Sequence, residues 1–76
     1  MANKQNYHIQ WKNNFSGEEG YVGSVRKSKG YFVNSWTLED AKIYRSVSAA
    51  EKDLVILEEL GETKNNTMTI VAEPAE

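Results

Sequence analysis

Apolar residues recur at helical spacing in one stretch, residues 46–61, and this pattern predicts the main helix of the chain. One face of that helix carries apolar side chains and the opposite face carries charged ones. The apolar set is Val47, Ala50, Leu54 and Leu57, and the charged set is Glu51, Lys52, Glu58 and Glu59. A single helix of this length is marginal in water, so its apolar face needs a sheet to pack against.

The ends of the helix carry capping signals. Ser48 and Glu51 have the spacing of a capping box, which predicts that the Ser48 hydroxyl accepts a hydrogen bond from a free amide of the first turn. Gly61 follows Leu60 and predicts the stop, because glycine adopts the left-handed conformation without steric cost.

Alternation of period two predicts four strands, three before the helix and one after it. They are expected at about 7–11, 21–27, 31–36 and 67–73. In the first strand Tyr7, Ile9 and Trp11 share one face, so His8 is expected to face solvent on the other.

The same alternation is expected in the second strand. It places Tyr21, Gly23 and Val25 on one face, and Val22, Ser24 and Arg26 on the other.

The connections carry turn chemistry. Residues 27–30 predict a hairpin with Gly30 at positive φ, and Thr37 is expected to cap a helical turn over residues 37–41. Phe15, in the polar segment 13–20, is expected to fold back onto the edge of the core. The order β-β-β-α-β predicts an α+β fold: a small antiparallel sheet with one main helix across one face. Residues 1–76 form a single domain with loose ends at about 1–5 and 74–76.

Composition narrows the class of protein. The chain has 76 residues and no cysteine, so neither a disulfide framework nor a thiolate metal site is available. The sequence shows neither a membrane span nor a signal peptide, which predicts a cytoplasmic protein without membrane contact. Residues 1–45 carry a surplus of three positive charges and residues 46–76 a surplus of five negative ones. This asymmetry is a weak hint of an acidic partner for the first half, and internal charge balance together with solubility is the favoured explanation.

Candidate catalytic chemistry is sparse. The single histidine, His8, has no cysteine or acidic cluster beside it, so we expect no metal site. The acidic pairs at 18–19 and 39–40 are expected to be solvated, because one sheet layer with one helix rarely forms the cleft that paired carboxylates need. The glycines at 17, 20 and 23 lack the lysine and helix of a phosphate loop. We therefore expect a non-enzymatic protein without a cofactor.

Two surfaces are candidates for binding. A helix covers only one face of the sheet, and Val22, Phe32, Trp36 and Val71 cannot all fit under it. Val22, Phe32 and Trp36 are therefore expected to contact a protein partner or a second copy of the chain. An equally weighted expectation is that the twist of the sheet and segment 37–45 cover them. The alternative is nucleic acid, bound by Lys12 and by Arg26, Lys27 and Lys29 of the hairpin, with aromatics close by for stacking. The acidic balance of the whole chain makes this second partner less favoured.

A resemblance adds context. The run Tyr21-Val22, then residues 37–46 (TLEDAKIYRS), then Ala49-Ala50 resembles small, mostly uncharacterised phage and prophage proteins of Gram-positive bacteria. This resemblance implies a small accessory protein. The order of three strands and a helix is also similar to the arm-site DNA-binding domains of phage integrases. The chain departs from those domains in its acidic helix and in its additional strand after Asn66.

Overall fold

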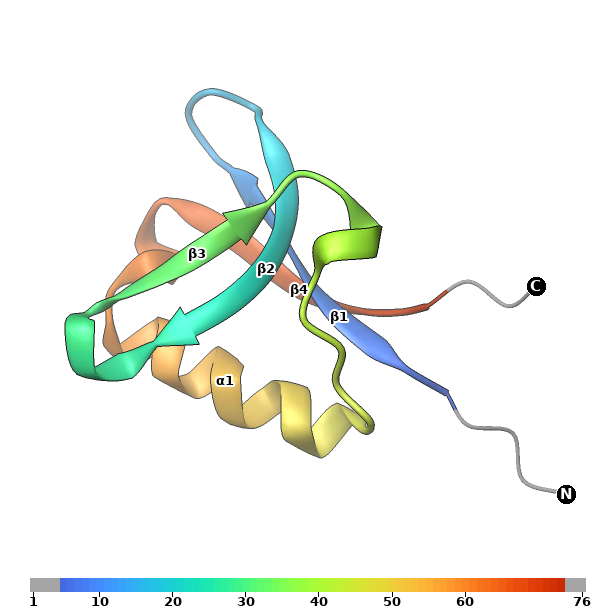
Figure 1. The fold of residues 1–76 in the computed structure, drawn as a ribbon. Coiled ribbons are helices and arrows are strands. Elements are labelled where there is room, and N and C mark those ends of the chain that lie inside the picture. The colour runs from blue at the N-terminus through green and yellow to red at the C-terminus, as the bar shows by residue number, and fades with distance from the viewer. Residues whose placement is uncertain (1–4, 74–76) are drawn as a thin grey trace, which may run out of the picture.

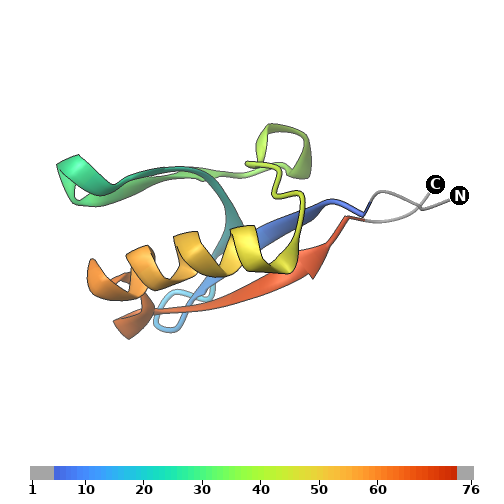
Figure 2. The same cartoon turned by 90° about the horizontal axis from the view of Figure 1, so that it is seen from below.

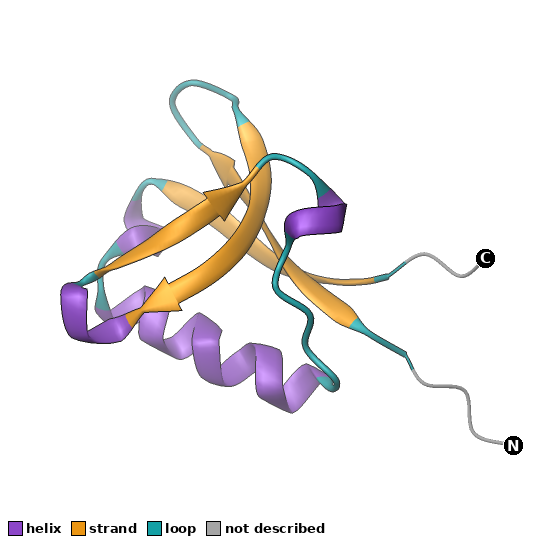
Figure 3. Cartoon of the chain, viewed as in Figure 1, coloured by secondary structure: helices purple, strands orange, loops and turns teal. Residues whose placement is uncertain are grey.

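The computed structural model describes residues 5–73 and shows a four-stranded antiparallel sheet with one helix packed on it (Figure 1). The predicted α+β class and the order β-β-β-α-β are confirmed. The strands are β1 (Tyr7–Asn13), β2 (Glu19–Arg26), β3 (Tyr31–Ser35) and β4 (Asn66–Ala72), and the helix is α1 (Val47–Glu59). Three short 3-10 turns, η1 (Lys27–Lys29), η2 (Leu38–Asp40) and η3 (Glu62–Lys64), lie between them (Figure 3). Apart from Gln5, the expected loose ends lie outside the described residues.

The strand order across the sheet is β3-β2-β1-β4. β1 and β4 pair over seven residues without interruption, with Ile9 opposite Ile70 and Trp11 opposite Met68. Directly opposed residues of an antiparallel pair share a face, and these four side chains face α1. The alternation predicted for both strands is therefore confirmed.

β1 and β2 pair over only three residues, from Lys12 opposite Glu19 to Gln10 opposite Tyr21, and then diverge. The segment 41–44 fills the space that this divergence opens. Tyr7 and Tyr44 exchange two backbone hydrogen bonds of 2.8 and 2.9 Å, and the Lys42 amide donates to the Val22 carbonyl at 2.9 Å. This segment, called the crosspiece below, satisfies backbone groups that β1 and β2 would otherwise leave unpaired.

A β-bulge interrupts the register of β2 and β3 between Val22 and Ser24. The extra residue reverses the alternation, so Val22 and Val25 both face the core rather than opposite sides. Val22 is completely buried, and the expectation that it lies on an uncovered face is wrong for this reason. The buried core consists of Ile9, Trp11, Val22, Tyr44, Ala50 and Leu57.

The N-cap of the helix lies two residues before the predicted one. The Ser46 hydroxyl accepts a hydrogen bond from the Ala49 amide at 3.2 Å, and the Ser48 capping box is wrong. Ser46 is extended because the crosspiece directly before it pairs with β1, so the helix starts as soon as that pairing ends. The predicted stop at Gly61 is confirmed, with φ of 83°.

The turns differ from expectation at one residue. Gly30 has φ of 81° and the Thr37 side chain caps η2, as predicted. Phe15, however, is 81 % exposed. The Asn13 side chain accepts hydrogen bonds from the amides of Phe15 and Ser16 at 2.9 and 2.8 Å. This local turn holds the ring away from the core edge that it was expected to cover.

Candidate functional site

Trp36 lies directly after β3 and is 63 % exposed. Its ring meets the ring of Trp11 edge to face, with centroids 5.5 Å apart and planes at 65°. Trp11 is buried, and its indole N–H donates to the Tyr21 carbonyl at 3.1 Å. A fixed, buried indole therefore orients an exposed one, so the Trp36 ring is held in place before any partner arrives.

The Trp36 ring stands between two hollows in the surface. The first, of about 320 Å³, lies on the helix side of the sheet and is lined by Trp11, Phe32 and Asn34. Glu18 and Glu62 also line it. The second, of about 470 Å³, lies along β2 and β3 beside the bulge, and its lining includes Gly23, Val33 and Asp40. We call Trp36 and these two hollows the Trp36 surface.

The structure brings together two of the three residues expected to contact a partner. Phe32 is half-buried and lines the first hollow with Trp36, whereas Val22 lies in the core. Asn34 and Val33, which sequence reasoning did not single out, complete the surface. Their positions on alternate sides of β3 follow from strand geometry, but the bulge that positions β3 left no clear sequence signal.

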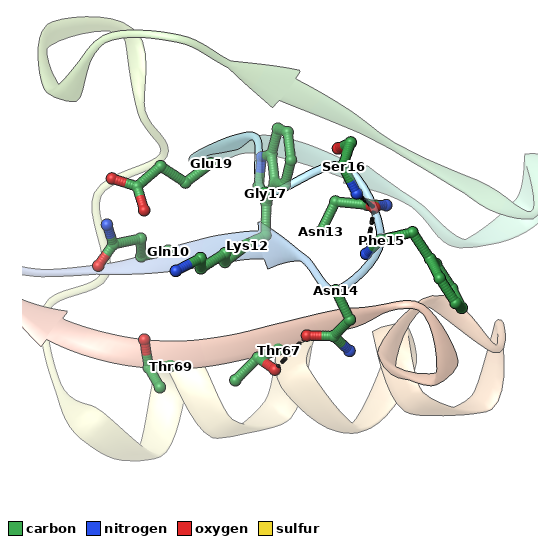
Figure 4. Close-up of a pocket in the computed structure, with 11 residues that line it drawn as sticks. Gln10, Lys12, Asn13, Asn14, Phe15, Ser16, Gly17, Glu19, Thr67 and Thr69 are labelled. Carbon is green, nitrogen blue, oxygen red and sulfur yellow. Dashed lines mark hydrogen bonds between the residues drawn. The ribbon is translucent and has the colours of Figure 1, made fainter.

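A polar groove of about 580 Å³ crosses the sheet face opposite the helix (Figure 4). Gln10 and Lys12 of β1, Thr67 and Thr69 of β4 and Glu19 of β2 project into it. The turn after β1 closes one end, where the Thr67 hydroxyl donates to Asn14 Oδ1 at 2.8 Å. These amide, hydroxyl and ammonium groups can hydrogen-bond a polar ligand. The polar positions of β1 and β4 alternate as expected of strands, but no local pattern predicts that these two strands become neighbours and form the groove.

The basic hairpin is exposed, as the nucleic-acid alternative requires. Arg26, Lys27 and Lys29 all lie at the turn between β2 and β3. Lys12 does not join them. It pairs with Glu19 at the start of β2, whereas Arg26 ends that strand, and seven residues of strand span about 23 Å.

His8 is 1 % exposed, so the expectation that it faces solvent is wrong. The crosspiece covers the face on which it lies. Nδ1 is 3.0 Å from the Lys42 carbonyl oxygen, and Nε2 is 3.2 Å from Glu73 Oε1. Both ring nitrogens therefore lie within hydrogen-bonding distance of an oxygen atom. The hydrogen bonds from Asn6 and from His8 hold the pKa of Glu73 below its ordinary value.

A second polar cluster ties the crosspiece to the helix. The Tyr44 hydroxyl and the Lys42 ammonium both donate to Asp53 Oδ2 at 2.7 Å. Burial, together with the hydrogen bond to Asp53 and the charge of that carboxylate, raises the pKa of Tyr44 above its ordinary value. Because the Asp53 carboxylate is shared by these two donors, the cluster is a structural clasp.

Within residues 5–73, no helix is long and apolar enough to cross a membrane, and no three His, Asp or Glu side chains gather as metal ligands would. Comparisons of the chain with models of protein families, with curated proteins and with solved structures give no match. The function proposed below therefore rests on the surfaces of the chain itself.

Proposed function

We propose that this protein is a small, non-enzymatic binding domain that docks a protein partner on the Trp36 surface. The observation that carries this proposal is an indole that is 63 % exposed and yet held edge-on by the buried Trp11. Tryptophan is enriched among the residues that dominate binding energies at interfaces. A ring that is already oriented loses little conformational freedom when a partner covers it.

The surroundings of Trp36 suit a protein rather than a small molecule. Phe32 provides apolar contact beside it, and Asn34 and Glu18 supply polar groups at the rim. An apolar centre with a polar rim is the usual arrangement of a protein–protein interface. The two hollows flank the indole, so a partner with two protruding side chains would enclose it from both sides.

A peptide selection tests this proposal. Peptides are selected from a displayed random library on the wild-type protein, and their affinities are then measured on Trp36→Ala and on Tyr31→Ala. Tyr31 is a matched control because it is an exposed aromatic residue at the other end of the same strand. We expect Trp36→Ala to weaken binding by about 30-fold or more, the loss of a hot-spot residue of about 2 kcal/mol. Binding that survives Trp36→Ala would reject the surface.

A second copy of the chain is the other occupant that this surface could take. Sedimentation equilibrium of the wild-type protein and of Trp36→Ala distinguishes it from a different protein. A dimer that dissociates in Trp36→Ala would identify self-association, and a monomer that binds selected peptides would identify a separate partner.

Nucleic acid is the second candidate, favoured by three exposed cations at one end of the molecule, Arg26, Lys27 and Lys29. A titration with a DNA duplex at low and at physiological salt tests it. If the tip binds phosphates, affinity falls with salt with a logarithmic slope near three, and replacing Lys27 and Lys29 by alanine removes about two-thirds of that slope. The control replaces Lys52 and Lys64, which lie on α1 and η3, and should change nothing.

The resemblance to phage and prophage proteins supports a role as an accessory protein in the bacterial cytoplasm. Neighbouring genes provide the test. A position within a cluster of phage genes is expected, and a position within a metabolic operon would contradict it.

A further inference from the structure

Among the described residues, β4 is an edge of the sheet, with β1 on one side and no strand on the other. Its first and last hydrogen bonds to β1 fix which backbone groups face outward. The Glu73 amide donates to the Asn6 carbonyl and the Asn14 amide donates to the Asn65 carbonyl, both at 2.8 Å. Hydrogen-bonded pairs alternate along an antiparallel ladder, so the odd-numbered residues of β4 face β1. The backbone groups of Met68, Ile70 and Ala72 therefore point outward.

This edge has none of the features that protect a natural sheet from pairing. From Asn66 to Ala72 the strand carries no charge and no proline, and it pairs with β1 without a bulge. No hydrogen bond within residues 5–73 occupies the outward amides of Met68, Ile70 and Ala72. An edge of seven residues left in this state is a template for one more strand.

The flank of α1 beside this edge has a distinct chemistry. Asp53 faces the crosspiece, which lies on the β2 side of the helix. Successive helical residues are rotated by about 100°, so the flank away from Asp53 is the one about 60–120° from the buried Ala50 and Leu57. That flank carries Val47, Glu51 and Glu58. Figure 2 shows β4 and the β2–β3 hairpin on opposite sides of α1.

Val47 on this flank is 43 % exposed. Glu51 and Glu58 are exposed as well. A strand added to β4 would place alternate side chains against this flank, where it would meet apolar surface and two negative charges.

We propose that the outer edge of β4 binds an extended, basic peptide segment of a partner protein by strand addition. The backbone of the segment pairs with the outward groups of Met68 and Ile70. Its alternate side chains cover Val47, and lysine or arginine pairs with the two glutamates. Backbone pairing supplies affinity and the side-chain contacts supply specificity in this mode of recognition.

A second copy of the chain fits the edge less well. Two antiparallel β4 strands paired about a two-fold axis would place the two α1 helices side by side on one face. The flank with Glu51 and Glu58 would then face the same flank of the other copy. Like charges opposed in this way repel, whereas a basic strand is attracted.

Hydrogen exchange and peptide titration test the proposal. In the free protein, we expect the amides of Met68 and Ile70 to exchange quickly and those of Thr69 and Val71 to be protected. The probe is a seven-residue peptide of alternating valine and threonine with lysine at both ends, and the control is the same peptide with glutamate at both ends. We expect the basic peptide to bind at least about tenfold more tightly, since two ion pairs become two repulsions. It should also protect Met68 and Ile70.

Two variants separate the backbone from the charges. Ala72→Pro removes an outward amide that the ladder to β1 does not use, and Ala72→Val retains it. We expect the first to weaken the basic peptide severalfold and the second to have little effect. Exchanging Glu51 and Glu58 for lysine should reverse the preference between the two peptides.

Three outcomes would overturn the proposal. They are equal binding of both peptides, chemical shift changes confined to the Trp36 surface, and a dimer that Ala72→Pro dissociates. Trp36→Ala should leave this binding unchanged. The two proposed surfaces can therefore fail independently.

Discussion

The two halves of the sheet are built differently. β1 and β4 pair over seven residues in one register, and the helix covers them. β2 meets β1 over three residues only, bends away, and pairs with β3 through a bulge. In the first half the side chains alternate regularly between core and surface. In the second half the bulge shifts that alternation, and the crosspiece fills the gap between β1 and β2.

We propose that this difference separates folding stability from binding at the Trp36 surface. The regular half contains Ile9, which packs in the core with Leu57. The outer face of this half carries polar side chains, and the β4 strand at its edge carries no charge. The bent half carries Trp36, Phe32 and the basic hairpin, which lie at the margin of the core. Because fewer buried contacts depend on them, residues of the bent half are available to bind a partner at little cost to folding.

The largest expected effect is in the regular half. Ile9→Ala should lower the free energy of unfolding by about 3 kcal/mol, because the side chain is fully buried and its loss leaves a cavity. Phe32→Ala in the bent half should lower it by only about 1 kcal/mol, since that ring is half-buried. Urea unfolding at 25 °C measures both. Equal losses would show that the two halves contribute alike.

The junction of the halves is the next target. His8→Ala removes the donor that faces the Lys42 carbonyl and should cost about 2 kcal/mol in unfolding free energy. Gln10→Ala is the control, because Gln10 lies on the same face of the same strand but is only half-buried. A loss for His8→Ala no larger than for Gln10→Ala would mean that the crosspiece is held by its backbone hydrogen bonds alone.

The clasp between crosspiece and helix should contribute less. Tyr44→Phe keeps the packing of the ring but removes its 2.7 Å hydrogen bond to Asp53, at an expected cost of about 1.5 kcal/mol. Tyr7→Phe is the matched control, since the Tyr7 hydroxyl makes no hydrogen bond within residues 5–73. If both variants unfold at the same urea concentration, the clasp adds nothing to stability.

The smallest expected effect is the pH dependence at Glu73. Its folded-state pKa lies below the ordinary value of 4.5, so its contribution is present above that pH and disappears as the pH falls through the lowered value. Wild-type protein should therefore be more stable than Glu73→Gln at pH 6, and the difference should shrink toward pH 3. Urea midpoints at these two pH values measure it. A difference that does not change with pH would show that the carboxylate is not held by His8 and Asn6.

The sequence indicated part of the candidate site. Phe32 and Trp36 were expected at a surface and line one hollow together, because aromatics in excess of what one helix can cover must lie at the margin. Val22 was wrongly expected with them, because regular alternation was assumed along β2. The extra residue of the bulge reverses that alternation, and Val22 lies in the core. The polar groove and the free edge of β4 depend on which strands become neighbours. No local pattern contains that information.

The amino-acid sequence alone determined the elements: the helix and its stop at Gly61, the alternation of β1 and β4, and the turn at Gly30. These follow from local rules of periodicity and backbone geometry, which operate within a few residues. Tertiary structure decided the burial of His8, the cap at Ser46 and the position of Val22. Each depends on segment 41–44 reaching β1 or on the bulge opposite β3, and such long-range pairings are settled only when the whole sheet assembles around its core.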